Sequence, residues 1–455
     1  MQTEGVAFVD PYLLGAPIKD PDNFFGRREL LQRVCERLSK RESTSLVGQR
    51  RSGKTSTLYY LMSAAAQHAL GLDSQGLVFV YLNPQLGMRE PEEFYTELVE
   101  ALNEEVPSLA LHSSGEITRR QVRAALKQLE PRRLVLLLDE FERLIGNERF
   151  PVDFFEFLRG LAGHHEVRFV TATLRRLPEC YWGEWEGSPL YNIFPPPERL
   201  GSWTPQEFDE FLATTSKRCG LSIVTHKSSI SSLAGRFPFY VQMACSFYLE
   251  VWRKRGEVTA EDHVRVERRF AEAASVHFDR IWRKHLSLEE KEALRALVEG
   301  QEPGDAAALR KLVQKGYVVD GRIFSRALRE FVRCQGAPSR PRVRVSESEV
   351  PVKKGVWLDR RAGEVWVDGE RCAPPLTDLM HKLLLYLYDN AVCICDKYEL
   401  VENVWGGEYL KDVDDARIAK LVSRLRRRVE PDPKHPRYVK TVHGRGYKLA
   451  PAGED

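Results

Sequence analysis

Apolar residues in the first 180 positions gather in four short runs, separated by longer segments with a helical period. The runs are rich in valine and leucine and do not alternate strictly with polar residues; they lie at 43–47, 77–82, 134–138 and 167–172. Runs of this kind are typical of strands covered on both faces. Helical spacing is found at 27–40, 92–105 and 119–130. The alternation of strands and helices predicts a parallel α/β sheet.

The next 130 residues have a mainly helical pattern. From about 200 to 280, aromatic and charged residues are interleaved, which favours a helical domain. Ser287 and Glu290 form a capping-box signal before an apolar helix, and a second helix is predicted at 306–315. Residues 317–324 follow as a hairpin around Asp320-Gly321. Two helices and a hairpin together predict a winged helix.

The last hundred residues form a further pattern after a segment rich in Pro, Ser and Arg. A hairpin is predicted at 356–367, and a helix at 376–390 with Leu379, Leu383, Leu384 and Leu387 on one face. Helices at 397–405 and 415–429 and a hairpin at 438–447 complete it.

The predicted organisation therefore has six parts. They are an N-terminal extension (1–20), an α/β core (21–198), a helical domain (199–282), a winged helix (283–334), a linker (335–350) and a C-terminal winged helix (351–455).

Composition narrows the class of protein. No stretch of 18 apolar residues occurs, so no transmembrane helix and no membrane partner are expected, and residues 1–20 lack the pattern of a secretory signal. The eight cysteines contain no C-x-x-C pair, which favours reduced structural thiols and a cytoplasmic location. The net charge is only +3, but residues 417–448 hold eleven Lys or Arg against two acids. This local excess of positive charge is typical of a nucleic-acid-binding surface.

The segment from Gly48 to Thr55 matches the phosphate-binding pattern G-x-x-x-x-G-K-[ST]. A predicted strand precedes it and a predicted helix, 56–66, follows, as the motif requires. The glycines let backbone amides converge on phosphate oxygens at a helix N-terminus. We expect Lys54 to reach the β- and γ-phosphates and Thr55 to coordinate Mg²⁺. The sequence predicts ATP or ADP with Mg²⁺ as ligand; the alternative is a chance match.

A second motif completes this site. The run 134–138 ends in Asp139-Glu140, a Walker-B pattern in which Asp139 holds Mg²⁺ and Glu140 acts as general base. The alternative is that a buried strand simply ends in a solvated Asp-Glu turn. After the run 167–172, Thr173 is placed to contact the γ-phosphate or the attacking water. Arg175 or Arg176 is a charge sensor, an inter-subunit finger or a surface residue.

The order of these motifs resembles AAA-type and STAND-type ATPases of the archaeal-ATPase and bacterial STAND branches. The resemblance implies that 21–198 form a P-loop ATPase core of the ASCE type and that 199–282 form its helical lid. The resemblance rests on Phe24-Phe25-Gly26-Arg27, the phosphate loop, the acidic pair and Gly235-Arg236-Phe237-Pro238, although Arg236 replaces a family glycine. It implies that 24–27 border the adenine and that Pro238 lies over the base. The nucleotide contacts it predicts are Phe24, Phe25, Gly26, Arg27, Gly48, Arg51, Ser52, Gly53, Lys54, Thr55, Ser56, Thr173 and Pro238.

The C-terminal basic residues are predicted to meet duplex DNA. The polar face of helix 415–429 and the following hairpin share one sign of charge, which suits a helix in the major groove and a wing along the backbone. Val404-Trp405-Gly406 and Gly444-Arg445-Gly446-Tyr447 are among the residues that resemble the OmpR/PhoB-type winged helix of response regulators. The predicted contacts are Arg417, Lys420, Arg424, Arg427, Thr441, His443 and Arg445. Asp415 is expected to be an N-cap.

These features favour an ATP-binding, slowly hydrolysing switch that controls DNA binding, most simply a transcriptional regulator. It would form a homo-oligomer in the ATP state and meet RNA polymerase or a signal protein. Two alternatives stay open: a DNA-stimulated AAA-type ATPase of a defence or mobile-element system, and a nucleotide-bound scaffold whose winged helices bind protein.

Overall fold

The computed structural model describes most of the chain. The described residues are 10–72, 76–84, 88–109, 117–164, 167–180, 190–336, 355–359, 364–374, 376–389, 395, 397, 400, 401, 404, 411–442 and 446–450. The chain divides into two compact units, residues 1–340 and 341–455. The division falls within the segment proposed above as a linker, and each unit is described by itself.

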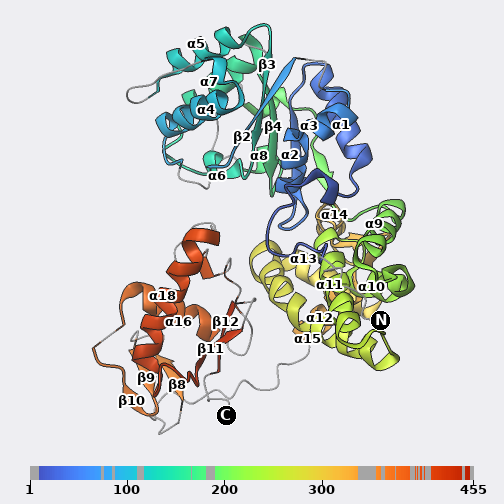
Figure 1. The fold of residues 1–455 in the computed structure, drawn as a ribbon, viewed down its shortest axis with the longest axis vertical. Helices are drawn as coiled ribbons and strands as arrows, with labels where there is room; N and C mark the ends of the chain where they lie inside the picture. Colours follow the sequence, from blue (N-terminus) through green and yellow to red (C-terminus); the bar gives the residue numbers. More distant parts are fainter. Residues whose placement is uncertain are drawn as a thin grey trace, which may run out of the picture. The chain divides into compact units, whose positions relative to one another are not determined.

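A five-stranded, wholly parallel sheet forms the centre of the ATPase core (Figure 1). Its order is β2-β3-β4-β1-β5. The strands are β1 (Thr44–Gly48), β2 (Leu77–Leu82), β3 (Arg133–Leu138), β4 (Arg168–Thr173) and β5 (Glu198–Leu200). Strand β4 lies between β1, which leads into the phosphate loop, and β3, which leads into the acidic pair. This is the ASCE arrangement predicted from the sequence.

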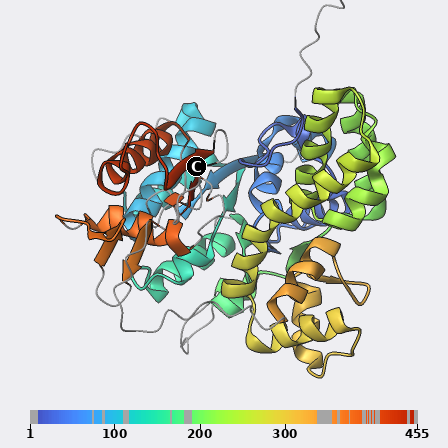
Figure 2. The same ribbon diagram turned by 90° about the horizontal axis from the view of Figure 1, so that it is seen from below.

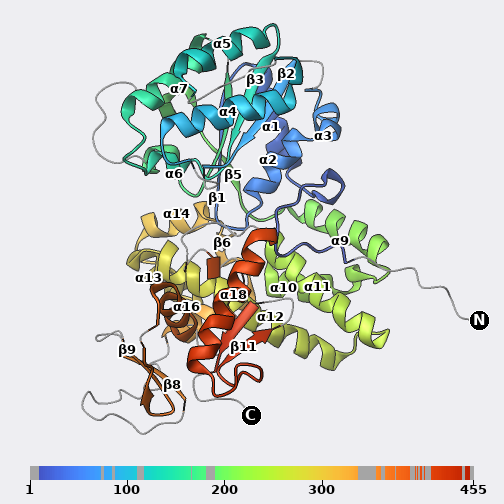
Figure 3. The same ribbon diagram turned by 60° about the vertical axis from the view of Figure 1, so that its left-hand side comes forward.

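Both faces of the sheet are covered by helices, which explains the unbroken apolar runs (Figures 1 and 3). Leu134, Leu136 and Leu138 of β3 pack towards one cluster, whereas Val135 and Leu137 pack towards another. The first cluster includes residues of α4 (Pro91–Glu105), α5 (Arg119–Leu129) and α7 (Val152–His164). The second includes residues of α1 (Arg28–Ser39) and α2 (Lys54–Met62). Shorter helices are α3 (Ala64–Ala69), α6 (Glu142–Ile145) and α8 (Leu177–Cys180).

The helical lid and the winged helix share one hydrophobic core. The lid comprises α9 (Pro205–Cys219), α10 (Lys227–Ala234), α11 (Pro238–Arg255) and α12 (Ala260–Arg280), and α12 continues as a π-helical turn, Ile281–His285. The winged helix comprises α13 (Leu288–Glu299), α14 (Ala306–Gln314), β6 (Val318–Val319), β7 (Arg322–Ile323) and α15 (Arg326–Gly336), coloured yellow to orange in Figure 2. The Ser287 capping box is as predicted, and so is the turn at Asp320-Gly321, where both residues have positive φ.

The C-terminal unit is a small α/β domain with its own core. Its sheet strands are β8 (Val356–Asp359), β9 (Glu364–Val367) and β10 (Glu370–Arg371), and its hairpin is β11 (Val439–Val442) with β12 (Gly446–Leu449). The helices are α16 (Asp378–Asp389) and α18 (Lys411–Val429). Most of the helix expected at 397–405 lies outside the described residues.

Three sequence expectations about elements were wrong. The helix expected at 56–66 begins at Lys54 and is interrupted at Ser63, whose extended backbone and hydroxyl cap the separate helix α3. Leu379 does not share the buried face of Leu383, Leu384 and Leu387; it is 39% exposed and Met380 takes the buried place. Asp415 is not an N-cap, because α18 begins at Lys411, and its carboxylate instead accepts a 2.7 Å hydrogen bond from Lys397 Nζ.

Among the described residues, no helix is both long enough and apolar enough to cross a bilayer.

Candidate functional site

The phosphate loop is a tight turn between β1 and α2 that side chains would obstruct. A Cβ on Gly48 would lie 2.4 Å from Ser52 Oγ, and Gly53 has φ of 93°, a conformation that favours glycine. Ser52 is buried, and its Oγ has no hydrogen-bond partner within the described part of the chain. No side chain caps the N-terminus of α2. Open amides beside a partnerless hydroxyl form a cradle that fits phosphate oxygens.

Lys54 supplies the positive charge of this cradle. It is 5% exposed, and its Nζ donates hydrogen bonds to the backbone carbonyls of Gly48 at 2.9 Å and Gln49 at 3.4 Å. The ammonium is thus folded over the loop at its position in the first turn of α2. A buried cation held by carbonyl groups is a suitable partner for a phosphate anion. The residues present therefore fit a nucleoside phosphate.

The carboxylate of Asp139 lies directly beside Thr55. Thr55 Oγ1 donates a 2.6 Å hydrogen bond to Asp139 Oδ2, so the two predicted Mg²⁺ residues are brought together. The phenol of Tyr81 donates to the same oxygen at 3.1 Å. Burial raises the pKa of Asp139, while the hydrogen bond from Thr55 opposes this shift. Hydroxyl and carboxylate oxygens are the ligands that Mg²⁺ prefers, and these two would hold the ion.

Two further acids follow Asp139. Glu140, the predicted general base, has φ of 45°, and its amide donates a 3.0 Å bond to Asp139 Oδ1. Left-handed backbone at a non-glycine residue costs about 1–3 kcal/mol and is concentrated at functional sites. Glu142 accepts a 3.0 Å bond from the amide of Leu174, and its Oε2 is buried and partnerless in the described structure. Burial, aided by Glu140, raises the pKa of Glu142 to about 7.

The end of β4 lies next to these acids, but its predicted polar contact is already engaged. Thr173 is fully buried, and its hydroxyl donates a 2.6 Å bond to the carbonyl of Arg175. Arg175 and Arg176 are exposed. Thr173 therefore stabilises the turn that positions Arg175, and contact with a phosphate requires that bond to break.

The segment Phe24–Arg27 joins the core to the lid. Phe24 stacks on Tyr60 of α2 at 4.4 Å, and Phe25 packs edge-on against Phe211 of α9 at 5.2 Å. Gly26 has φ of 76° and fits closely against the Trp203 indole. Arg27 is buried, and its guanidinium donates to the backbone carbonyls of Ser52 and Gly201. The Arg27 side chain thus fastens the phosphate loop to the chain entering the lid.

The predicted Pro238 motif begins the central lid helix. Pro238 is buried at the first turn of α11, and the next residue, Phe239, lies under the Arg51 guanidinium at 4.3 Å. Gly235 has φ of 60°, and a Cβ there would meet the carbonyl oxygen of Phe324 at 2.2 Å. The motif is therefore in contact with the phosphate loop at one end and with the winged helix at the other.

Residues before the core also reach the loop. Arg51 donates a 2.9 Å bond to the Leu14 carbonyl, and the Ile18 amide donates a 3.0 Å bond to Ser56 Oγ. Tyr12 is buried in the lid core, and the Leu13 amide donates to Gln242 of α11 at 3.2 Å. The N-terminal segment therefore ties lid helices to the loop that is predicted to bind phosphate.

The winged helix touches the phosphate loop directly. The Tyr317 phenol donates a 3.1 Å hydrogen bond to Gln49 Oε1. Nearby, His285 closes the π-helical turn, and its carbonyl accepts a 2.8 Å bond from Lys315. Burial lowers the pKa of His285 to about 4, and the positive charges of Arg50, Arg280, Lys315 and Arg175 add to this shift. The surroundings of the loop are strongly positive on this side, which favours anions.

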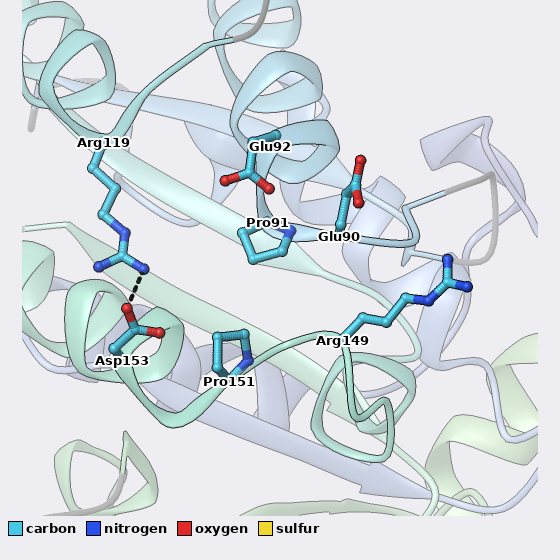
Figure 4. Close-up of a pocket in the computed structure, with 7 residues that line it drawn as sticks. All are labelled: Glu90, Pro91, Glu92, Arg119, Arg149, Pro151 and Asp153. Atoms are coloured by element: carbon cyan, nitrogen blue, oxygen red, sulfur yellow. Dashed lines mark hydrogen bonds and ion pairs between the residues drawn. The ribbon is translucent and has the colours of Figure 1, made fainter.

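A separate polar pocket of about 580 Å³ lies at the N-termini of α4, α5 and α7 (Figure 4). Its lining residues are Glu90, Pro91, Glu92, Arg119, Arg149, Pro151 and Asp153. Arg119 and Asp153 form a 2.8 Å ion pair across it. The lining includes none of the residues of the phosphate loop or the acidic pair, so this pocket is distinct from the predicted nucleotide site.

Helix α18 presents a row of basic residues on its exposed side. Arg417, Lys420, Arg424 and Arg427 are exposed, whereas Ile418, Leu421, Val422 and Leu425 are buried in the domain core. The 3.6-residue period separates the two sets. The predicted contact residues of the helix thus share one face that is open to solvent.

The hairpin after α18 is braced by charged side chains. Glu430 is 8% exposed and accepts hydrogen bonds from the amides of Arg437, Tyr438 and Val439 at 2.6–3.0 Å. Arg426 donates to the Val439 carbonyl at 2.8 Å and to Thr441 Oγ1 at 2.7 Å. Thr441 is exposed on β11 next to this brace. His443 and Arg445, the other predicted wing contacts, lie outside the described residues.

Each of the two units contains a segment that matches the model of a known protein family. Residues 39–303 match the model of the family described as "Novel STAND NTPase 2", which is more than half of the chain. The chain belongs to the novel STAND NTPase 2 family. Residues 372–449 match "Transcriptional regulatory protein, C terminal". This STAND NTPase is therefore an NTPase domain fused to a domain like those of response regulators, and this composition suggests a transcriptional regulator. Both resemblances predicted from the sequence are confirmed.

Similar proteins match one part or the other. The sensory transduction protein RegX3 of Mycolicibacterium smegmatis is 36% identical over 94 residues, which are 21% of this chain and 40% of that protein. This STAND NTPase thus spans less than half of that relative. The Walker-type ATPase PABY2304 of Pyrococcus abyssi is 16% identical over 70% of this chain and 98% of that one, with a TM-score of 0.49. The RstA DNA-binding domain of Klebsiella pneumoniae is 27% identical, with a TM-score of 0.20. The match covers 23% of this chain and 99% of that domain.

Two residues of the STAND NTPase site were not singled out from the sequence. Glu142 is part of the Leu-Asp-Glu-Phe-Glu run, so its signal was present but carried no role. Tyr81 occupies the end of a different strand, and nothing in its own surroundings points to Asp139. Only the pairing of β2 with β3 brings it there.

Proposed function

We propose that this STAND NTPase is a nucleotide-controlled transcriptional regulator. ATP or ADP with Mg²⁺ binds at the loop Gly48–Thr55, and the nucleotide state governs whether the C-terminal winged helix binds duplex DNA. The exposed basic face of α18 contacts the major groove and the adjoining hairpin follows the backbone. The family matches give the two kinds of domain, and this proposal adds how one domain controls the other.

The observation that carries the proposal is the hydrogen bond between Tyr317 and Gln49. The phosphate-loop pattern leaves the residue type at Gln49 unspecified, and the Gln49 side chain accepts a hydrogen bond from Tyr317 of the winged helix. A phosphate entering the cradle competes with the carbonyl groups for Lys54 and reorganises the loop. A change in the loop can move the winged helix only if the contacts between them differ between the nucleotide-free and the nucleotide-bound state. The bond between Tyr317 and Gln49 is a contact that can differ in this way.

Hydrolysis serves the switch in this proposal. Glu140 polarises the attacking water, Lys54 stabilises charge on the phosphates, and Thr55 and Asp139 hold Mg²⁺. The backbone strain at Glu140 and the engaged hydroxyl of Thr173 support a site that must rearrange before turnover. We therefore propose slow turnover, with the ATP state forming a homo-oligomer that meets RNA polymerase or a signal protein in the cytoplasm.

The test measures mass and DNA binding together on the full chain. Light scattering and mobility shift are recorded with ADP, with a non-hydrolysable ATP analogue, and with Lys54→Ala as a variant that cannot hold phosphate. We expect the analogue alone to raise the mass to that of an oligomer or to change DNA affinity at least about fivefold. A fivefold change in affinity corresponds to about 1 kcal/mol of coupling.

Equal mass and equal DNA affinity under all three conditions would overturn the switch. Rapid hydrolysis stimulated by DNA and lost in Glu140→Gln would favour a DNA-dependent ATPase instead. Absence of DNA binding at low salt would favour a scaffold that binds protein.

A further inference from the structure

A tyrosine from the neighbouring strand completes the surroundings of Asp139. Tyr81 is the penultimate residue of β2, and it is paired in register with Leu137 of β3. Parallel pairing continues beyond the strands, because the Asp139 amide donates a 3.0 Å bond to the Leu82 carbonyl. The backbones of Tyr81 and Asp139 are therefore held in a fixed relation at the edge of the sheet where the nucleotide is proposed to bind.

The hydrogen bonds to Asp139 fix the orientation of its carboxylate. Oδ2 accepts from the Thr55 hydroxyl at 2.6 Å and from the Tyr81 phenol at 3.1 Å, and Oδ1 accepts from the Glu140 amide at 3.0 Å. Asp139 is 1% exposed, so a rotation that broke these bonds would leave oxygen atoms buried without a donor. Three donors on two oxygens leave the carboxylate one favourable orientation.

The Tyr81 ring is itself held by the helix that begins at the phosphate loop. It stacks on Tyr59 with 4.8 Å between ring centroids and 28° between planes. Tyr59 and Thr55 are four residues apart on α2 and share one helix face. Lys19 Nζ lies 5.1 Å from the Tyr59 ring on the N-terminal segment. The contacts thus form a closed ring from Thr55 through Asp139, Tyr81 and Tyr59 back to α2.

From this geometry we infer that Tyr81 is a positioning residue, which orients the Asp139 carboxylate for Mg²⁺ through its phenol hydroxyl. The inference rests on the proposed nucleotide site and adds a residue to it. Groups that orient a metal-holding carboxylate influence metal affinity by about 10–100-fold. A tyrosine that served only the packing of β2 would act through its ring, and removal of its hydroxyl would leave the metal dependence unchanged.

The experiment uses the full chain and a fluorescent N-methylanthraniloyl derivative of ATP as probe. Its affinity is measured in EDTA and over a titration with MgCl2, for the wild type, Tyr81→Phe and Tyr60→Phe. Tyr60 is the matched control, because it is a tyrosine of the same helix as Tyr59 whose ring stacks on Phe24 instead. We expect Tyr81→Phe to raise the Mg²⁺ midpoint about tenfold or more while the affinity in EDTA stays within twofold. Tyr60→Phe should keep the wild-type midpoint.

The outcomes separate this inference from the proposed function. A wild-type Mg²⁺ midpoint in folded Tyr81→Phe overturns the positioning role and leaves the nucleotide site standing. Failure of the wild type to bind the probe at all overturns both. If Tyr81→Phe does not fold, Tyr59→Ala is the deciding variant, because it keeps the Tyr81 hydroxyl but removes the ring that stacks on Tyr81. A raised Mg²⁺ midpoint in Tyr59→Ala supports the inference, and an unchanged midpoint refutes it.

Discussion

Tyr317 of the winged helix donates a hydrogen bond to Gln49 of the phosphate loop, with 3.1 Å between phenol oxygen and amide oxygen. The tyrosine is 2% exposed and the two residues are 268 positions apart in the chain. The bond joins the proposed phosphate site to the winged helix that follows the lid. A rearrangement at either end therefore changes the surroundings of the other. This hydrogen bond is a direct physical route for the proposed switch.

Removing this bond should alter nucleotide preference. For Gln49→Ala and for Tyr317→Phe we expect a two- to tenfold change in the ratio of ADP to ATP-analogue affinity, since one hydrogen bond contributes about 0.5–1.5 kcal/mol. The double variant should change the ratio no more than either single variant, because both remove the same interaction. Calorimetric titration measures the ratio, and Tyr240→Phe, at a buried tyrosine of the lid helix α11, is the control. Additive effects would contradict the coupling.

The buried carboxyl of Glu142 should make stability fall as pH rises. Its pKa is raised to about 7 in the folded chain, from about 4.5 when unfolded. Between these values the folded state keeps the proton that the unfolded state has released, so stability declines as pH rises towards 7 and stays low above it. Glu142→Gln should therefore raise stability by about 1–3 kcal/mol at pH 8 and change it little at pH 4. Thermal unfolding against pH measures this, with exposed Glu148→Gln as control.

The basic face of α18 should contribute electrostatically to DNA affinity. Removal of one cation that pairs with a DNA phosphate reduces the slope of log affinity against log salt by about 0.9. We expect Arg424→Ala and Arg427→Ala each to weaken binding and to lower that slope by about one. Arg268→Ala removes an exposed arginine of the other unit and should leave the slope unchanged. An unaltered slope in all three variants would place the DNA-binding surface elsewhere.

Glu430 should stabilise the folded state of the C-terminal unit. Its carboxylate accepts hydrogen bonds from three backbone amides of the segment that enters β11, and Glu430→Ala leaves those of Tyr438 and Val439 buried without this acceptor. We expect the stability of that unit to fall by about 2–4 kcal/mol. The unfolding of this unit is followed by hydrogen exchange of the Val422 and Leu425 amides in the interior of α18, which do not bond to Glu430. Asp432→Ala, a nearby exposed acid, is the matched control.

Local patterns in the sequence determined much of the fold. Valine- and leucine-rich runs predicted the sheet strands, because a strand buried on both faces must be apolar along its whole length. The capping box at Ser287 and the turn at Asp320-Gly321 were predictable because neighbouring residues alone satisfy their hydrogen bonds and φ angles. The loop Gly48–Thr55 was likewise evident, because its glycines and Lys54 lie within one short segment.

Contacts between distant segments were decided only by the tertiary structure. Tyr81 reaches Asp139 because β2 and β3 are neighbours in register, and Gln49 meets Tyr317 because the lid returns the winged helix to the loop. The exposure of Leu379 was mispredicted for the same reason. The N-cap expected at Asp415 was wrong because α18 begins at Lys411, and the Asp415 carboxylate instead accepts a hydrogen bond from Lys397. A helical period identifies an apolar face, but the neighbouring elements decide how far that face is covered. The sequence by itself thus determined a phosphate loop and a basic helix, and the packing of separate elements decided which side chains surround them.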